Sequence, residues 1–127
     1  MKRSRILHGF WDSLNDIEDR ISLLDVYESD VSVIRNLVYT QTSKDKQTLD
    51  LLYPSEKKNR YPLIMLVHGG GFVSGNHTRY YLDYATRLAK RGFVVANVSY
   101  RLAGDAAFPA SIEDLFEALR FLIDQSK

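Results

Sequence analysis

Leu63-Ile64-Met65-Leu66-Val67 runs directly into His68-Gly69-Gly70-Gly71-Phe72, and this stretch decides the fold. The apolar run is typical of a strand that is buried on both faces of a parallel sheet. Glycines lack a Cβ atom, so the three that follow reach conformations with positive φ and leave their N–H groups accessible. Several N–H groups that point at one developing negative charge form an oxyanion hole. We therefore predict a buried strand that ends in an anion-stabilising loop.

The residues that follow predict a strand–helix–strand unit. Thr78–Arg91 reads as a helix, and Gly92 fits the position just beyond its end. The apolar stripe of this helix is Tyr81, Tyr84, Ala85 and Leu88. Phe93–Val98 is a second apolar run and predicts a second buried strand. A strand, a helix and a strand in this order imply a right-handed crossover between parallel strands.

Alternating apolar residues predict two strands before this unit. Val31, Val33, Leu37 and Tyr39 alternate up to a short polar linker, and Leu49, Leu51 and Tyr53 alternate up to Pro54. The short linker favours an antiparallel pair. Further towards the N-terminus, the spacing of apolar residues predicts a helix from about Phe10 to Leu24. Two roles are open for this helix, which either packs against the domain or covers an active site.

A last helix is predicted near the C-terminus. Ser111-x-x-Asp114 resembles a capping box at its start. The apolar residues expected on its buried face are Ile112, Leu115, Phe116, Leu119 and Leu122.

Composition excludes several classes of function. The chain has 127 residues, enough for one domain, and a net charge of +1, which argues against a nucleic-acid-binding surface. It has no cysteine, so disulfides and thiol nucleophiles are excluded. No metal-ligand spacing and no phosphate-binding G-K-[ST] follow the glycines, so we predict neither a metal nor a cofactor. No signal peptide and no run of about 18 apolar residues is present, so we expect a cytoplasmic protein without a membrane span.

Three segments together resemble one known family. Thr48–Pro54, Val67–Gly75 and the run Ser99-Tyr100-Arg101-Leu102, followed by Phe108-Pro109-Ala110 and Asp114, are similar to the first half of α/β-hydrolases of the carboxylesterase/lipase group. The similarity is to feruloyl-esterase-like and hormone-sensitive-lipase-like enzymes, and it covers about residues 31–125. It implies an α/β fold, namely an incomplete α/β-hydrolase with four N-terminal strands and two crossover helices. The chain then divides into an N-terminal helical segment, 1–30, and half of a hydrolase domain, 31–127.

The resemblance also assigns roles to individual residues. It implies that the backbone N–H groups of Gly70 and Gly71 contribute to the oxyanion hole, and that His68 and Gly69 orient the loop. Three side chains are expected near the substrate pocket, and these are Phe72, His77 and Tyr80. Arg101 and Asp114 are expected to form a structural ion pair that braces the loop between them. The substrate of the completed enzyme would be a small acyl ester or an acylated sugar.

The catalytic triad itself is missing from this pattern. The chain has no G-x-S-x-G elbow to present a nucleophilic serine. Ser74 is one residue away from that spacing, and Ser99 and Ser111 have no glycines placed to expose them. We therefore predict a partial serine carboxylic-ester hydrolase that lacks the nucleophile, the acid and the base, and that is inactive alone.

A non-catalytic reading remains open beside this one. In the resembling family the strand that bears the nucleophile lies next to the strand equivalent to Leu63–Val67. Without that neighbour, this apolar strand would form an open edge of the sheet, and such edges pair with other strands. The alternative function is therefore an interaction module that pairs with a second copy or with a complementing chain.

Overall fold

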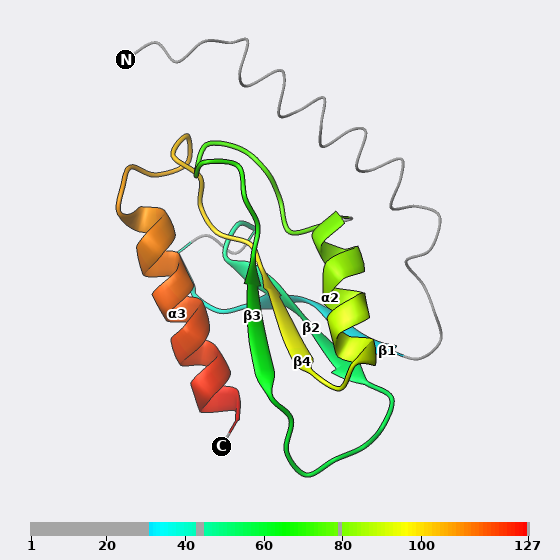
Figure 1. Ribbon diagram of the computed structural model, residues 1–127. Coiled ribbons are helices and arrows are strands. Elements are labelled where there is room, and N and C mark those ends of the chain that lie inside the picture. Colours follow the sequence, from blue (N-terminus) through cyan, green and yellow to red (C-terminus); the bar gives the residue numbers. More distant parts are fainter. Residues whose placement is uncertain (1–30, 43–44, 79, 127) are drawn as a thin grey trace.

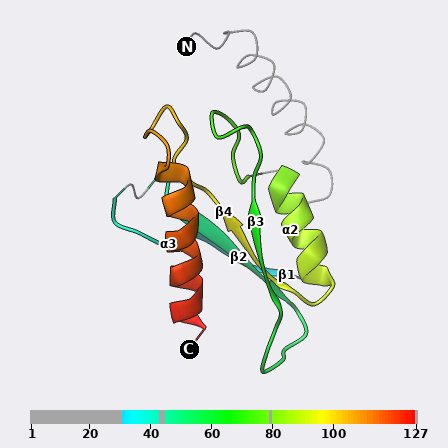
Figure 2. The same ribbon diagram turned by 60° about the vertical axis from the view of Figure 1, so that its left-hand side comes forward.

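The computed structural model describes residues 31–42, 45–78 and 80–126 of the chain (Figure 1). The helix predicted for Phe10–Leu24 and the proposed segment 1–30 lie outside the described residues. The described elements are β1 Val31–Val38, β2 Thr48–Pro54, β3 Leu63–Val67, α2 Tyr80–Lys90, β4 Val94–Val98 and α3 Ala110–Gln125. The strands form one sheet in the order β1-β2-β4-β3. Helices α2 and α3 cover opposite faces of this sheet (Figure 2).

Strands β1 and β2 form the antiparallel pair that the alternation predicted. Their register runs from Val31 opposite Pro54 to Val38 opposite Thr48, with a bulge between Ile34 and Leu37. Within this bulge Asn36 has a φ of 56°, a conformation that asparagine tolerates better than most residues. Strand β2 then pairs with β4, again antiparallel, so β2 lies between two neighbours and nearly all of its residues are buried.

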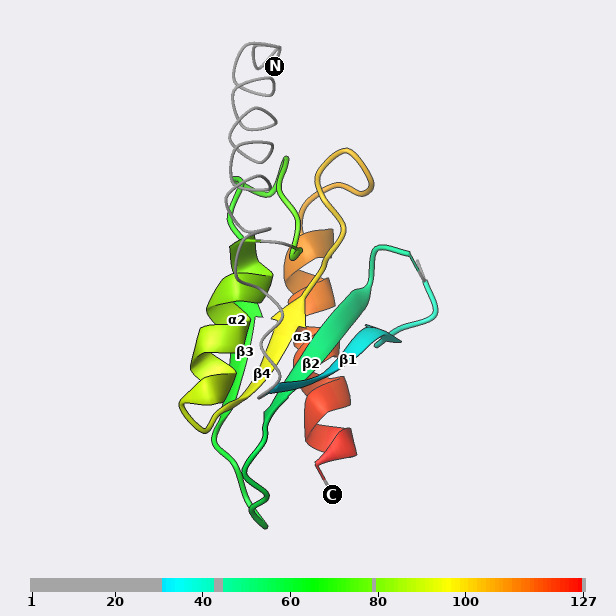
Figure 3. The same ribbon diagram turned by 90° about the vertical axis from the view of Figure 1, so that its right-hand side faces the viewer.

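The predicted strand–helix–strand unit is present. Strands β3 and β4 are parallel and in register from Leu63 opposite Val94 to Val67 opposite Val98, and α2 connects them. Gly92 has a φ of +98°, which explains why a glycine follows the helix. The adjacent strands appear side by side in a face-on view of the sheet (Figure 3).

The two apolar strands differ in burial. All five residues of β4 are buried, as predicted, because β4 lies between β2 and β3. For β3 the prediction of burial on both faces is wrong. Its residues are only partly buried and Leu63 is 43% exposed. The physical reason is its position, since β3 has a neighbour on one side only within the part of the chain that the structure describes.

Each helix covers its own apolar layer. Leu82, Ala85 and Ala89 of α2 pack on Leu52 and Val95 of the sheet. On the opposite face, Ala118 and Leu122 of α3 join a cluster formed by the strands, whose buried sheet members include Leu49, Leu51, Ala96 and Val98. The predicted stripe of α2 is wrong at one position, since Tyr84 is exposed. The Tyr84 hydroxyl instead makes a hydrogen bond with the hydroxyl of Tyr80, one turn earlier.

The start and the faces of α3 also differ from the prediction. The helix begins at Ala110 after Pro109 and has no side-chain cap, so Ser111 lies inside the helix and the predicted capping box is absent. The buried residues of α3 are Ala110, Ser111, Asp114, Ala118 and Leu122. Phe116 and Leu119, predicted to be buried, are exposed, Phe116 by 65%. Helical spacing identified an apolar face, and the described fold leaves part of that face uncovered.

Candidate functional site

The chain leaves β3 at Val67 and enters a tight loop whose shape requires glycine. Gly70 has a φ of +129°, and a Cβ atom placed on it would lie 2.0 Å from the carbonyl oxygen of Ser74. A Cβ atom on Gly75 would lie 2.3 Å from the carbonyl oxygen of Gly69. Gly71 differs, because its φ is +62° but no atom lies within 4 Å of such a Cβ. Two glycines are thus fixed by close contact and one by backbone conformation alone.

The hydrogen bonds of this loop gather on one carbonyl. The carbonyl oxygen of Gly70 accepts bonds from the N–H groups of Val73 and Ser74, both at 3.2 Å, and from the Ser74 hydroxyl at 3.4 Å. In contrast, neither the Gly70 nor the Gly71 N–H donates a hydrogen bond to any residue in the described ranges. The loop therefore closes on itself through an acceptor and keeps two backbone donors available, which is what the stabilisation of an oxyanion requires.

His68 is enclosed at the start of the loop. Its ring stacks on Tyr100 with a centroid distance of 4.3 Å, and its Nδ1 lies 2.9 Å from the carbonyl oxygen of Gly69. A carbonyl only accepts, so Nδ1 carries the proton. Burial lowers the pKa of His68 below its ordinary value, although the bond to Gly69 acts in the opposite direction. The neutral ring thus holds the first glycine carbonyl, which agrees with the predicted orienting role.

Two tyrosines complete the support of this end of the loop. The Tyr100 hydroxyl donates to the carbonyl oxygen of His68 at 2.7 Å, and burial raises the pKa of Tyr100 to about 12. The Gly69 N–H donates to the Tyr81 hydroxyl, also at 2.7 Å. Sequence reasoning left the role of Tyr81 open between pocket and core and did not identify Tyr100 as part of the site. Both reach the loop from elements that are distant in sequence.

The three residues predicted for the substrate pocket lie in different surroundings. Phe72 is exposed and tilts against Tyr100, with ring centroids 6.0 Å apart. Tyr80 lies at the start of α2 against the rings of Tyr81 and Tyr84.

His77 is turned towards β2. Its Nε2 lies 3.6 Å from Asp50 Oδ2, and only 12% of its side chain is exposed. Its carbonyl accepts a hydrogen bond from Asn97 Nδ2. These contacts favour an anchoring role for His77 over the predicted substrate contact.

Arg101 and Asp114 form the ion pair that the resemblance implied. Arg101 Nη2 lies 2.7 Å from Asp114 Oδ1, and the backbone N–H of Arg101 donates to Oδ2 at 2.9 Å. Asp114 is buried and also accepts a bond from Gln47 Nε2 at 2.6 Å. One carboxylate therefore joins the loop before β2, the loop after β4 and helix α3. Its distance from the glycine loop in sequence and its set of partners are those of a structural brace.

Chemistry beyond the oxyanion loop is not assembled in the described residues. The Ser74 hydroxyl is bonded to Gly70, and in the described part of the chain no histidine makes a hydrogen bond to a serine hydroxyl. Residues 31–42, 45–78 and 80–126 contain no group of three or more His, Cys, Asp or Glu side chains that would hold a metal ion. Among the same residues, neither α2 nor α3 has the length and apolar character needed to cross a membrane.

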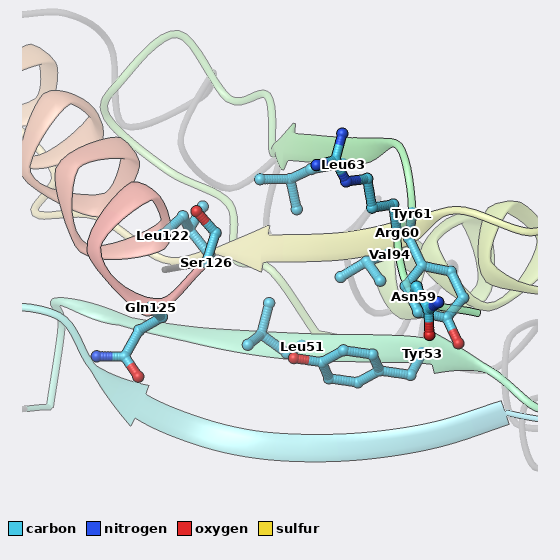
Figure 4. A pocket seen from close by; sticks show the side chains of 10 residues that line it. All are labelled: Leu51, Tyr53, Asn59, Arg60, Tyr61, Leu63, Val94, Leu122, Gln125 and Ser126. Atoms are coloured by element: carbon cyan, nitrogen blue, oxygen red, sulfur yellow. The ribbon is translucent and has the colours of Figure 1, made fainter. Parts of the chain in front are cut away.

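The largest cavity lies away from the glycine loop. A groove of about 510 Å³ runs between the end of α3 and the loop before β3 (Figure 4). It is lined by Leu51, Tyr53, Asn59, Arg60, Tyr61, Leu63, Val94, Leu122, Gln125 and Ser126. Leu63 and Val94 are the first residues of their parallel strands, whereas the glycine loop follows the last residue of β3. The groove is thus at the opposite end of the sheet and is not the candidate active site.

Comparisons with known proteins identify the fold and the family. The sequence model of the BD-FAE family matches residues 49–127. Arylacetamide deacetylase-like 2 of Homo sapiens is 33% identical over 111 residues, which is 76% of this chain and 28% of that protein. Esterase B from Lactobacillus rhamnosis, solved with a tributyrin phosphonate inhibitor, superposes with a TM-score of 0.79 at 28% identity and covers 91% of this chain.

A carbohydrate esterase from gut microbiota superposes with a TM-score of 0.68 at 26% identity over 81% of this chain. The chain spans only 38% of the solved esterase B chain and 35% of the carbohydrate esterase chain. The family model covers more than half of the sequence, and the sheet order and crossover agree with these neighbours. The chain therefore belongs to the BD-FAE family and forms an incomplete α/β-hydrolase fold of the esterase type.

Proposed function

We propose that this chain supplies the oxyanion-hole segment of a serine carboxylic-ester hydrolase. The observation that carries the proposal is the pair of undonated N–H groups at Gly70 and Gly71, at the carboxyl end of a parallel strand. Ester hydrolysis passes through a tetrahedral intermediate, and the negative oxygen of that intermediate is stabilised by N–H donors placed in advance. The nucleophilic serine, the base and the acid come from outside the described residues.

The substrate class follows the same line. We propose a small acyl ester or an acylated sugar, supported by the similarity to an esterase that was solved with a tributyrin phosphonate and to a carbohydrate esterase. Neither the loop nor the exposed ring of Phe72 presents a charged side chain to the proposed oxyanion site. A neutral ester is thus a better match than a charged substrate.

A paired substitution tests the oxyanion assignment. Residues 31–127 would be fused to the part of esterase B that this chain does not cover, and hydrolysis of p-nitrophenyl butyrate would be followed. Gly70→Ala should reduce kcat about 100-fold to 1,000-fold, because its Cβ atom collides with the Ser74 carbonyl and displaces the donors. Gly71→Ala is the matched control and should keep kcat within about tenfold, since its Cβ atom meets no neighbour. Equal kcat values for the parent and the Gly70→Ala fusion would refute the assignment.

The unfused chain gives a complementary test. We expect no covalent labelling of the purified 127-residue chain by a fluorophosphonate probe, because no described serine is paired with a histidine. Stoichiometric labelling would contradict the proposal that the nucleophile lies outside this chain.

A second candidate function rests on the open side of the sheet. Strand β3 is uncharged and has no partner on its outer side among the described residues, and α3 exposes Phe116, Leu119 and Ile123. We propose that this surface pairs two copies of the chain edge to edge, with the exposed helix faces adding apolar contact. Sedimentation of the purified chain should then reveal a dimer. A strict monomer across the accessible concentration range would exclude self-pairing, and a heterodimer in source cells would identify a complementing chain instead.

A further inference from the structure

A buried polar cluster lies under the end of the glycine loop. Asp50 of β2 and Asn97 of β4 are direct cross-strand neighbours, and both are almost fully buried. Two residues further along the same face, Leu52 and Val95 belong to the apolar layer beneath α2. The α2 face of the sheet is therefore apolar for most of its length and polar where the strands approach the candidate site.

His77 seals this polar cluster with both its ring and its backbone. The ring lies with Nε2 3.6 Å from Asp50 Oδ2, and the carbonyl accepts a hydrogen bond from Asn97 Nδ2. Two neighbouring strands thus fix a single residue at the point where the loop returns to α2. The start of the loop is held by His68, Tyr81 and Tyr100, so the segment between is fastened at both ends.

The same carboxylate reaches the far side of the sheet. Asp50 Oδ1 accepts a hydrogen bond from the backbone N–H of Asn36 at 2.9 Å, inside the β1 bulge. A buried charge is stable only when its oxygens are occupied, and here one oxygen is used by the bulge and the other faces His77. The bulge therefore places a donor where Asp50 needs one, and this leaves the second oxygen directed at the loop.

Two further features distinguish this cluster from ordinary core packing. Asn97 Oδ1 is buried and has no hydrogen-bond partner among the described residues. Native proteins seldom leave such an atom unpaired, and exceptions concentrate where a residue is kept for function. Burial lowers the pKa of His77, Asp50 opposes this effect, and Arg35 of β1 adds to it, so the ring is neutral near pH 7.

We propose that Asp50, His77 and Asn97 are positioning residues that set the conformation of the glycine loop. Asn97 fixes the height of the loop's return through the His77 carbonyl, and Asp50 fixes its direction through the His77 ring. The cluster touches no reacting atom and acts on Gly70 and Gly71 only through the backbone between them. The catalytic meaning of this role rests on the proposed oxyanion function, but the fastening of the loop does not.

Amide hydrogen exchange on the whole chain tests the fastening without any catalysis. In His77→Phe, which keeps a ring but loses the nitrogen facing Asp50, we expect exchange at residues 69–78 to rise at least about tenfold, with exchange in β2 and β4 unchanged. In His77→Gln, which restores an N–H donor, we expect protection to return towards that of the parent chain.

Asn76→Ala is the matched control, because Asn76 is exposed in the same loop and bonds only to Thr78 among the described residues. It should leave exchange at Gly70 and Gly71 unchanged. Unaltered loop exchange in His77→Phe would overturn the proposal, and so would a rise of equal size throughout the sheet, which would assign the cluster to general stability. Failure of the fusion enzyme to depend on Gly70 would remove the oxyanion role and leave this result standing.

Discussion

The two edges of the sheet are built differently. At one edge, β1 contains a bulge, places Arg35 and Asn36 within it, and is tied to the interior by Asp50. At the other edge, β3 is an uninterrupted run of five apolar residues in regular register with β4. Both edges expose apolar side chains, Val33 and Ile34 on β1 and Leu63 on β3. The difference is therefore in backbone regularity and charge, and not in apolar exposure alone.

This difference shows which edge is finished. Bulges and charged residues are devices by which natural sheets prevent further strands from adding, and β1 has both. Strand β3 has neither, and α3 beside it keeps an uncovered apolar face. A surface of this kind is characteristic of an interface. The sheet is thus closed at β1 and prepared for a further strand at β3.

The largest expected effect concerns the brace that fastens α3, because the comparison holds only if α3 is fixed in place. Asp114→Asn leaves the Arg101 guanidinium without its partner in a largely buried site, and should lower the free energy of unfolding by about 3 kcal/mol. Urea unfolding followed by circular dichroism measures this. Glu117→Gln, which removes a surface pair with Arg120, should cost no more than about 0.5 kcal/mol. Similar values for both variants would mean that α3 is held by other contacts.

Matched lysine substitutions compare the edges directly. Leu63→Lys in β3 should weaken association about 100-fold, since it places a charge on the regular edge. Val33→Lys, at a similarly exposed position in β1, should leave association unchanged. Sedimentation equilibrium of both variants gives the two dissociation constants. An equal effect from the two variants would break the distinction between the edges.

The pH dependence separates the stability of the fold from the behaviour of the edges. Burial lowers the pKa of His68 and of His77, so above their ordinary value of about 6.5 both rings are neutral in the folded and unfolded chain. As the pH falls below that value, the unfolded chain takes up protons first, and the free energy of unfolding decreases until the folded pKa values are passed. Urea midpoints between about pH 5 and pH 8 measure this.

Neither β1 nor β3 contains a histidine, so association at the edges should not follow the same pH profile. The double variant His68→Gln/His77→Gln is the control and should flatten the dependence of stability. A profile that survives in this variant would assign the titration to other groups.

The smallest expected effect tests the bulge of the finished edge. Asn36→Val should destabilise the chain by about 1 kcal/mol, because a β-branched residue is strained at a φ of 56°. Asn36→Gly is the control, since glycine adopts this conformation freely and leaves the N–H that bonds Asp50 in place. Thermal unfolding of the two variants compares them. A tolerated valine would show that the bulge relaxes without cost.

The sequence predicted the local elements better than their surroundings. Apolar alternation and turn residues were enough to predict the strands, the connecting helix and the role of Gly92. Phe116 and Leu119 were assigned to a buried face because helical spacing reports which residues share a face, and it does not report whether anything covers that face. The burial of β3 was overestimated for the same reason.

The candidate site divides in a similar way. The glycines were recognisable because three in succession after an apolar strand are rare without a backbone requirement. The partners that hold them were not, because Asp50 meets Asn97 only through the register of β2 with β4, and that register is not written in either strand alone. A polar residue inside an apolar strand was the one signal present. The roles assigned to Gly70 and Gly71 remain predictions until the fusion enzyme is measured.

The close approach at Gly70 has a consequence for how the sequence varies. The Ser74 carbonyl occupies the space of the first side-chain carbon, so alanine is already excluded and larger residues add nothing to the penalty. Mutational tolerance at this position is therefore all-or-none, whereas at Gly71 it is graded by backbone preference. Two adjacent and chemically identical residues thus place different limits on genetic drift, and Gly70 is the one at which every amino-acid replacement has the same outcome.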